Sequence, residues 1–124
     1  MKTAISTADA PKAQGPYSQA VRAGGLLFLA GQIPLDPASG EVVGATAAEQ
    51  ARRCLENLRA VCEAAGTTLD RALRLTVYMT DLSAFAEDPP ARVAVGVGQL
   101  PRGAYVEIDA IVALPVSGAG GSAP

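Results

Sequence analysis

Apolar residues recur at three- and four-residue spacing through the middle of the chain, between Thr46 and Ala65. They are Ala51, Cys54, Leu55, Leu58, Val61, Cys62 and Ala65. Residues at this spacing share one face of an α-helix. Thr46 and Glu49 form a capping-box pattern, and Gly66 supplies a stop. The pattern predicts one amphipathic helix over 46–65, whose interleaved Arg and Glu side chains face solvent.

The remaining pattern is typical of β-strands, in which apolar and polar residues alternate. The expected strands are 18–23, 26–30, 73–79, 92–98 and 105–112. Gly24-Gly25 joins the first two as a hairpin, and 36–40 (DPASG) carries the residues of a tight turn. We therefore expect an α+β domain with a mainly antiparallel sheet and a helix on one face.

Composition sets the size and setting of this domain. The chain has 124 residues, 49% of them hydrophobic and 4% aromatic, so its core is built mainly from small aliphatic side chains. We expect one domain over 1–114, followed by a low-complexity, flexible tail over 115–124. A small core of this kind often gains stability by oligomerisation. The start of the chain lacks a signal-peptide pattern and no segment could span a bilayer, which favours a cytoplasmic protein.

Charge and residue types exclude several functions. The net charge is −2 and the pI about 5.0, so there is no basic footprint for nucleic acid or an anionic membrane. The chain has no histidine, which excludes Ser-His-Asp and Cys-His catalysis and the common zinc sites. Cys54 and Cys62 lie eight positions apart, roughly 12 Å along a helix, too far for a disulfide. Core positions explain them better than a redox role.

Chemistry must then come from carboxylates, arginines, tyrosines and backbone groups. If strands 92–98 and 105–112 form a hairpin, Arg92 faces Glu107 across it, beside small residues that leave room for a ligand. On spacing alone, an ordinary cross-strand salt bridge explains this pair better. Gly31 and Tyr17 lie in segments that are most simply turns.

Taken together and in order, these segments resemble the signature blocks of the RidA (YjgF) family. The matching blocks are GPYSQA (15–20), GQIPLDPASGE (31–41), AAEQARRCLENLRAVCEAAG (47–66), LTVYMTDLSAF (75–85), PPAR (89–92) and LPRGAYVEIDAIV (100–112). The resemblance covers nearly all of the chain up to Leu114. Its most selective part is the closing pair of blocks.

The resemblance implies a chorismate-mutase-like fold and a homotrimer with ligand clefts between neighbouring subunits. It implies an enzyme of the 2-iminobutanoate/2-iminopropanoate deaminase type, which hydrolyses 2-aminoacrylate and related 2-imino acids. Arg92 would bind the substrate carboxylate and Glu107 would activate water. Gly31 would offer backbone hydrogen bonds and Tyr17 would close the cleft. The resemblance implies no metal or organic cofactor, because an iminium carbon is already electrophilic.

Three departures from the family pattern bear on function. Ala30 stands where many relatives have Ser, and Ala94 stands where many have Cys. Between Phe85 and Pro89 the chain lacks about a dozen residues that form a second helix in relatives. The alternative function is therefore a non-catalytic ligand-binding or regulatory trimer on the same fold. An RNA-directed activity is disfavoured by the acidic pI.

Overall fold

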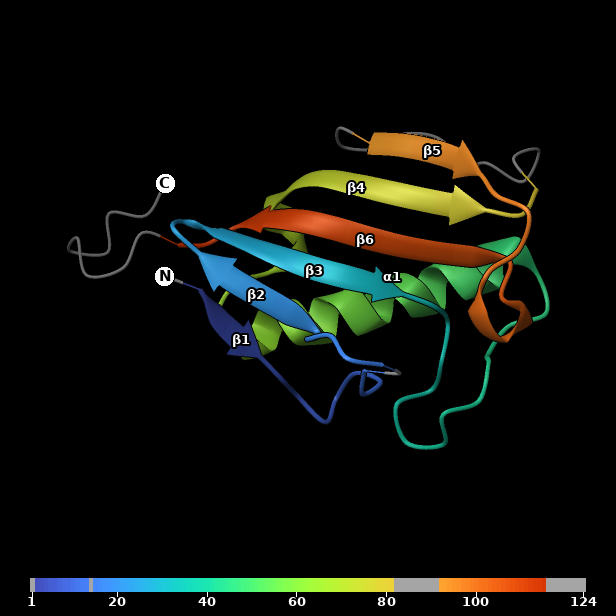
Figure 1. Cartoon of the computed structure of the whole chain (residues 1–124), viewed down its shortest axis with the longest axis horizontal. Helices are drawn as coiled ribbons and strands as arrows, with labels where there is room; N and C mark the ends of the chain where they lie inside the picture. The colour runs from blue at the N-terminus through green and yellow to red at the C-terminus, as the bar shows by residue number, and fades with distance from the viewer. Residues whose placement is uncertain (1, 14, 82–91, 116–124) are drawn as a thin grey trace.

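A computed structural model describes residues 2–13, 15–81 and 92–115. Its strands and helix are β1 (Thr3–Ile5), β2 (Ala20–Ala23), β3 (Leu26–Gln32), α1 (Ala47–Ala64), β4 (Ala72–Met79), β5 (Arg92–Gly96) and β6 (Val106–Ala113). The strands form one sheet in the order β1-β2-β3-β6-β4-β5. Each neighbouring pair is antiparallel except β4 and β5, which are parallel. Helix α1 packs across one face (Figure 1), and the expected α+β architecture is confirmed.

The local signals behind α1 act as expected. The Thr46 hydroxyl accepts a hydrogen bond from the Glu49 N–H at 3.1 Å, and the Glu49 carboxylate accepts one from the Thr46 N–H at 3.3 Å. These bonds satisfy N–H groups that have no partner within the helix. At the other end Gly66 takes a φ of 85°, a conformation that glycine adopts without strain. The predicted helix boundaries are thus confirmed to within one residue.

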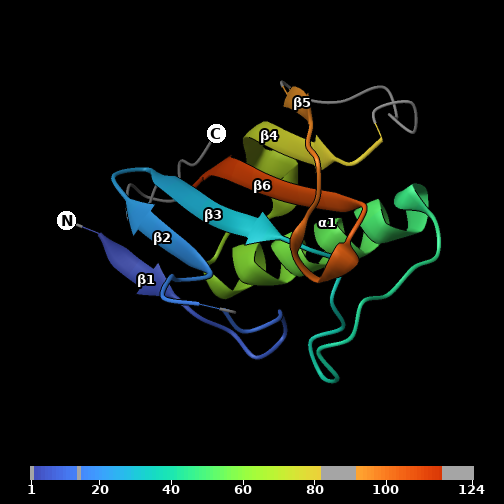
Figure 2. The same cartoon turned by 45° about the vertical axis from the view of Figure 1, so that its right-hand side comes forward.

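The core lies between α1 and the sheet (Figure 2). Strand β6 alternates fully, with Val106, Ile108, Ala110 and Val112 buried toward α1 and the intervening residues on the other face. From the helix, Cys54, Leu58, Val61 and Cys62 are fully buried against them. The opposite face of the sheet, called the open face below, carries no helix among the described residues.

One pairing expected from the sequence is wrong. Strands β5 and β6 do not form a hairpin, because β6 lies between β3 and β4 while β5 lies at the sheet edge beside β4. Strand β5 runs parallel to β4, an arrangement that requires a crossover connection and not a tight turn. Alternation predicted that both strands exist. It carried no information about their neighbours.

Strand β3 continues beyond Ala30 to Gln32, so Gly31 belongs to the strand and not to a turn after it. The hairpin around Gly24-Gly25 is confirmed, with Ala23 opposite Leu26. The missing second helix between Phe85 and Pro89, and the tail from residue 116 onward, lie outside the described residues.

Candidate functional site

The Glu107 carboxylate lies directly against Gly31 on the open face. A Cβ atom placed on Gly31 would be 3.0 Å from the carboxyl carbon of Glu107 and 3.1 Å from its Cγ. A β-bulge causes this close approach. Leu29 faces Ala110 and Gln32 faces Ile108, so two residues of β3 oppose the single residue Asp109. A side chain at position 31 would force the Glu107 carboxylate to move.

Glu107 is partly buried, with consequences for its charge. Its pKa is raised above the ordinary value, first because burial disfavours the ionised form and second because the carboxylate of Asp109 is close. A carboxyl group in this setting holds a proton more tightly than an exposed one. Such a group is a stronger base once ionised, as water activation requires.

The open face next to Glu107 is polar. Tyr78 of β4 lies opposite Glu107 in the strand register, and its hydroxyl donates a hydrogen bond of 3.1 Å to the Asp109 carboxylate. Burial and this bond raise the pKa of Tyr78. Sequence reasoning placed Tyr78 and Asp109 on strands but did not connect them to the site. Their spacing on separate strands offered no signal, since only the β4–β6 register brings them together.

Two buried amides on α1 fix the strand ends that carry the site. Asn57 is fully buried and donates to the carbonyls of Ile33 (3.3 Å) and Leu35 (3.0 Å), just beyond the end of β3. Gln50 accepts a 2.7 Å hydrogen bond from the Tyr105 N–H, just before β6 begins. A polar residue on the predicted apolar face of a helix was the available sequence signal.

Tyr17 lies near the same end of the sheet as Gly31. The chain passes from Tyr17 into β2, and the Gln19 carbonyl accepts a hydrogen bond of 3.0 Å from the Ala30 N–H. The Tyr17 side chain is 49% exposed, and the Tyr17 N–H donates to the Gly15 carbonyl at 2.8 Å in the expected turn. Tyr17 is therefore a largely exposed residue two positions before the backbone group that pairs with Ala30.

Arg92 does not face Glu107, contrary to the expected hairpin register. The residue begins β5, with Leu75 of β4 as its partner, whereas Glu107 lies opposite Tyr78. Strand β4 separates the two positions. Leu75 in turn pairs with Ala110, three residues beyond Glu107 along β6. From ordinary strand spacings their Cα atoms are about 14 Å apart. Within one chain, the structure brings together Glu107 and Gly31 but not Arg92.

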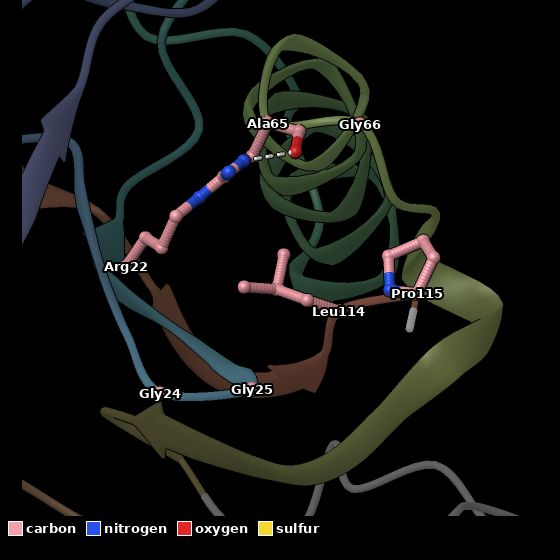
Figure 3. Close-up of a pocket in the computed structure, with 7 residues that line it drawn as sticks. All are labelled: Arg22, Gly24, Gly25, Ala65, Gly66, Leu114 and Pro115. Carbon is pink, nitrogen blue, oxygen red and sulfur yellow. Dashed lines mark hydrogen bonds between the residues drawn. The ribbon is translucent and has the colours of Figure 1, made fainter. Parts of the chain in front are cut away.

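A cavity of about 530 Å³ lies elsewhere, between the C-terminal end of α1 and the β2–β3 turn (Figure 3). Its lining residues are Arg22, Gly24, Gly25, Ala65, Gly66, Leu114 and Pro115. The Arg22 guanidinium donates to the Ala65 carbonyl at the helix end, where a positive charge is favourable. This contact gives Arg22 a structural role, and none of the expected site residues lines the cavity.

Other chemistry is weakly supported in the described part of the chain. Cys54 and Cys62 are buried free thiols, and burial raises their pKa values to about 12 and about 11, which makes them poor nucleophiles. Residues 2–13, 15–81 and 92–115 contain no group of three or more potential metal ligands of the Cys, Asp and Glu types. Within the same residues, no helix is both long and apolar enough to cross a membrane.

Comparison with known sequences identifies relatives along most of the chain. A family model described as endoribonuclease L-PSP matches residues 7–114. A RutC family protein of Sinorhizobium fredii is 50% identical over 121 residues, which cover 89% of this chain and 96% of the relative. The mouse protein named 2-iminobutanoate/2-iminopropanoate deaminase is 38% identical, covering 90% of each chain. The matched 89% of this 124-residue chain is about 110 residues, whereas the match itself is 121 residues long. The matched region of the Sinorhizobium protein therefore contains residues that this chain lacks.

Comparison with solved structures gives the same result for the fold. The crystal structure of RidA from an Antarctic Psychrobacter species superposes with a TM-score of 0.84 at 40% sequence identity. The match covers 90% of this chain and 99% of the Psychrobacter chain. The sheet order and the placement of α1 are therefore those of a known fold.

Proposed function

The chain belongs to the RidA (YjgF) family, whose model is described as endoribonuclease L-PSP, and we propose that it hydrolyses reactive enamines and imines. The proposed substrates are 2-aminoacrylate and related 2-imino acids, which become 2-oxo acids and ammonia. The observation that carries the proposal is the Glu107 carboxylate held against Gly31. The name of the mouse relative supports the substrate class.

In this proposal Glu107 is the general base. The enamine first tautomerises to the imine, whose carbon accepts the oxygen of a water molecule. Glu107 takes one proton from this water and delivers it to the nitrogen, which gives a carbinolamine. The hydroxyl proton then moves to the same nitrogen as the C–N bond breaks, so that ammonia leaves and the 2-oxo acid forms. The Gly31 backbone provides hydrogen bonds to the bound substrate, and Tyr17 covers the cleft. An iminium carbon is electrophilic by itself, so the proposed reaction uses no metal or organic cofactor.

Arg92 binds the substrate carboxylate in this scheme, because its guanidinium is a planar fork of donors that matches a carboxylate. The separation of Arg92 from Glu107 within one chain supports a site shared between subunits. Glu107, Gly31 and Tyr17 of one subunit would meet Arg92 of its neighbour in a homotrimer. The open face of the sheet supports this assembly, since Phe28 and Val93 are 42% and 36% exposed. The proposed setting is the cytoplasm.

The assay that tests the function generates 2-aminoacrylate enzymatically and measures the rate at which ammonia or the 2-oxo acid appears. We expect the protein to accelerate release above the spontaneous rate, and bulkier imino acids define its preference. Glu107→Gln should slow hydrolysis by about 10²–10⁴-fold, the usual range for loss of a general base. Arg92→Ala should abolish it through loss of carboxylate binding.

The alternatives give different results in the same assay. A non-catalytic ligand-binding trimer would bind small carboxylates without accelerating ammonia release, and Glu107→Gln would change nothing. Cleavage of RNA, which the family model's description names, is tested with a labelled RNA substrate. The net charge of −2 gives the chain little attraction for RNA. Ligand binding without ammonia release, or cleavage of the RNA, would replace the proposed function.

A further inference from the structure

A second carboxylate lies on the open face beside the proposed base. Asp109 follows Glu107 by two residues on β6, and both lie on the face that β6 turns away from α1. Residues two apart on a strand have Cα atoms roughly 7 Å apart. The Asp109 carboxylate is fixed by Tyr78, whose hydroxyl donates to Oδ2 at 3.1 Å. Neither residue has a role in the proposed mechanism so far.

We infer that Asp109, held in place by Tyr78, is a positioning residue that helps Glu107 take the proton from the attacking water. This inference rests on the proposed function. The physical basis is repulsion between two negative charges, which disfavours an ionised Glu107 and favours its protonated form. A base that gains a proton more readily removes one from water more readily.

The surroundings of Glu107 show why Asp109 has this effect. On β3 the nearest residue is Gly31, which carries no charge. On β4 the neighbouring groups are the Tyr78 phenol and, further along, the Arg74 guanidinium, whose charge acts on Tyr78. On α1 the Cys54 thiol stays protonated, because burial and then the charge of Glu107 raise its pKa to about 12. Among the described residues, Asp109 is the charged group that raises the pKa of Glu107.

Tyr78 holds the Asp109 side chain in place. The hydrogen bond from its hydroxyl to the Asp109 carboxylate prevents this short side chain from rotating away over the open face. Burial raises the pKa of Tyr78 itself, so the phenol remains a donor at neutral pH. Glu107 and Asp109 thus differ in environment although they are two residues apart.

The first test does not depend on activity. The side-chain carboxyl of Glu107 is titrated by ¹³C NMR in the ligand-free protein and in two variants that each lose one negative charge. Asp109→Asn removes the neighbouring carboxylate, and Asp70→Asn removes an exposed one outside the site. We expect the Glu107 midpoint to move to lower pH in Asp109→Asn and to stay near the original value in Asp70→Asn. Equal shifts in the two variants, or none, overturn the inference.

The second test measures kcat and KM for imine hydrolysis against pH. In Asp109→Asn the acidic limb of the pH–rate profile should move to lower pH, together with the titration midpoint of Glu107. Tyr78→Phe removes only the hydroxyl and should lower kcat with KM unchanged, a split that a purely structural role would not give. Unchanged profiles in both variants overturn the inference. No hydrolysis by the unsubstituted protein would overturn the proposed function, while the NMR titration would still decide whether Asp109 acts on Glu107.

Discussion

Gly31 is the residue on which the geometry of the site depends most directly. Its missing side chain leaves the space that the Glu107 carboxylate fills. The φ of Gly31 is ordinary, so its requirement for glycine comes from contact and not from backbone strain. Its immediate sequence context predicted a simple turn, and only the family resemblance gave Gly31 a role. The bulge in β3 makes it part of the site.

We predict that Gly31→Ala disables hydrolysis while the protein stays folded. The added methyl group would displace the Glu107 side chain, because backbone on β3 has less freedom to move than a side chain at the surface. A misplacement of about 1 Å at a catalytic group costs on the order of 10²-fold in rate. Gly25→Ala is the matched control, since a Cβ there meets nothing within 4 Å. Similar activity in the two variants would contradict the assigned contact.

The raised pKa of Glu107 makes the stability of the fold depend on pH. Its pKa in the folded protein lies above the unfolded value, since burial and Asp109 both raise it. Folding is therefore favoured by the protonated form, and this contribution is lost as the pH rises through the folded pKa. We expect Glu107→Gln, which cannot ionise, to gain free energy of unfolding relative to the original protein as the pH rises above the unfolded pKa of a glutamate, about 4.3. Denaturant unfolding at each pH measures the difference, and a constant difference would refute the shift.

At the scale of elements, α1 does more than cover the sheet. Its apolar face was predicted from spacing, but two amides on that face, Gln50 and Asn57, are buried as well. Asn57 holds two carbonyls beyond β3 and accepts hydrogen bonds from Arg53 at 3.2 and 2.8 Å. Buried amides are tolerated here because the side-chain oxygen and nitrogen of each have hydrogen-bond partners. The same bonds hold the ends of β3 and β6 that carry Gly31 and Glu107.

We predict that Asn57→Leu destabilises the protein strongly although it makes the core more apolar. The carbonyls of Ile33 and Leu35 would lose their donor, at about 1–3 kcal/mol for each buried group left unsatisfied. Thermal or denaturant unfolding measures the loss. Thr67→Val is the control, because it removes one hydrogen bond, 2.8 Å long, to the Ala113 carbonyl. A smaller loss in Asn57→Leu than in Thr67→Val would show that this segment is held by other contacts.

The strand pairing is the element-scale feature that sequence reasoning missed. Alternation identifies which residues of β5 and β6 share a face, and chain order suggested that the two strands were neighbours. The structure instead inserts β6 between β3 and β4. Alternation and chain order are both local signals. The strand order depends instead on which strands bury the most apolar surface together. Central β6 buries four alternating aliphatic residues against α1, whereas the shorter edge strand β5 has two valines beside an arginine, an alanine and a glycine.

At the scale of the whole molecule, one chain presents half of the proposed site. Arg92 and Glu107 lie on strands that are not adjacent, and apolar side chains on the open face remain exposed. A symmetric ring of subunits would cover this face and unite the two halves. Sedimentation should show the trimer that the family resemblance implies. A stable monomer with full activity would remove the basis for the shared site.

Mixing two inactive variants tests the shared site directly. Subunits with Arg92→Ala keep Glu107, and subunits with Glu107→Gln keep Arg92. If the residues meet across an interface, randomly mixed trimers should recover up to about a quarter of the original sites. Each variant refolded alone serves as the control for activity and assembly. No recovery in trimers shown to be mixed would place the whole site within one chain.

The sequence by itself determined the features that depend on neighbouring residues. The capping box and the periodicity of 47–64 specify α1, alternation specifies the strands, and Asp36 to Gly40 specify a turn whose Asp36 accepts from the Ser39 N–H at 2.8 Å. The family, and with it the residues proposed for the site, could also be recognised from the order of short motifs. All of these signals are local or cumulative along the chain.

Only the tertiary structure decided which of those residues meet. The strand order separates Arg92 from Glu107, and the β3 bulge brings Gly31 against Glu107. The β4–β6 register places Tyr78 beside Asp109. The physical reason is that strand order and register are set by the burial of apolar side chains summed over the whole sheet. That sum involves residues far apart in sequence, so no short segment contains it.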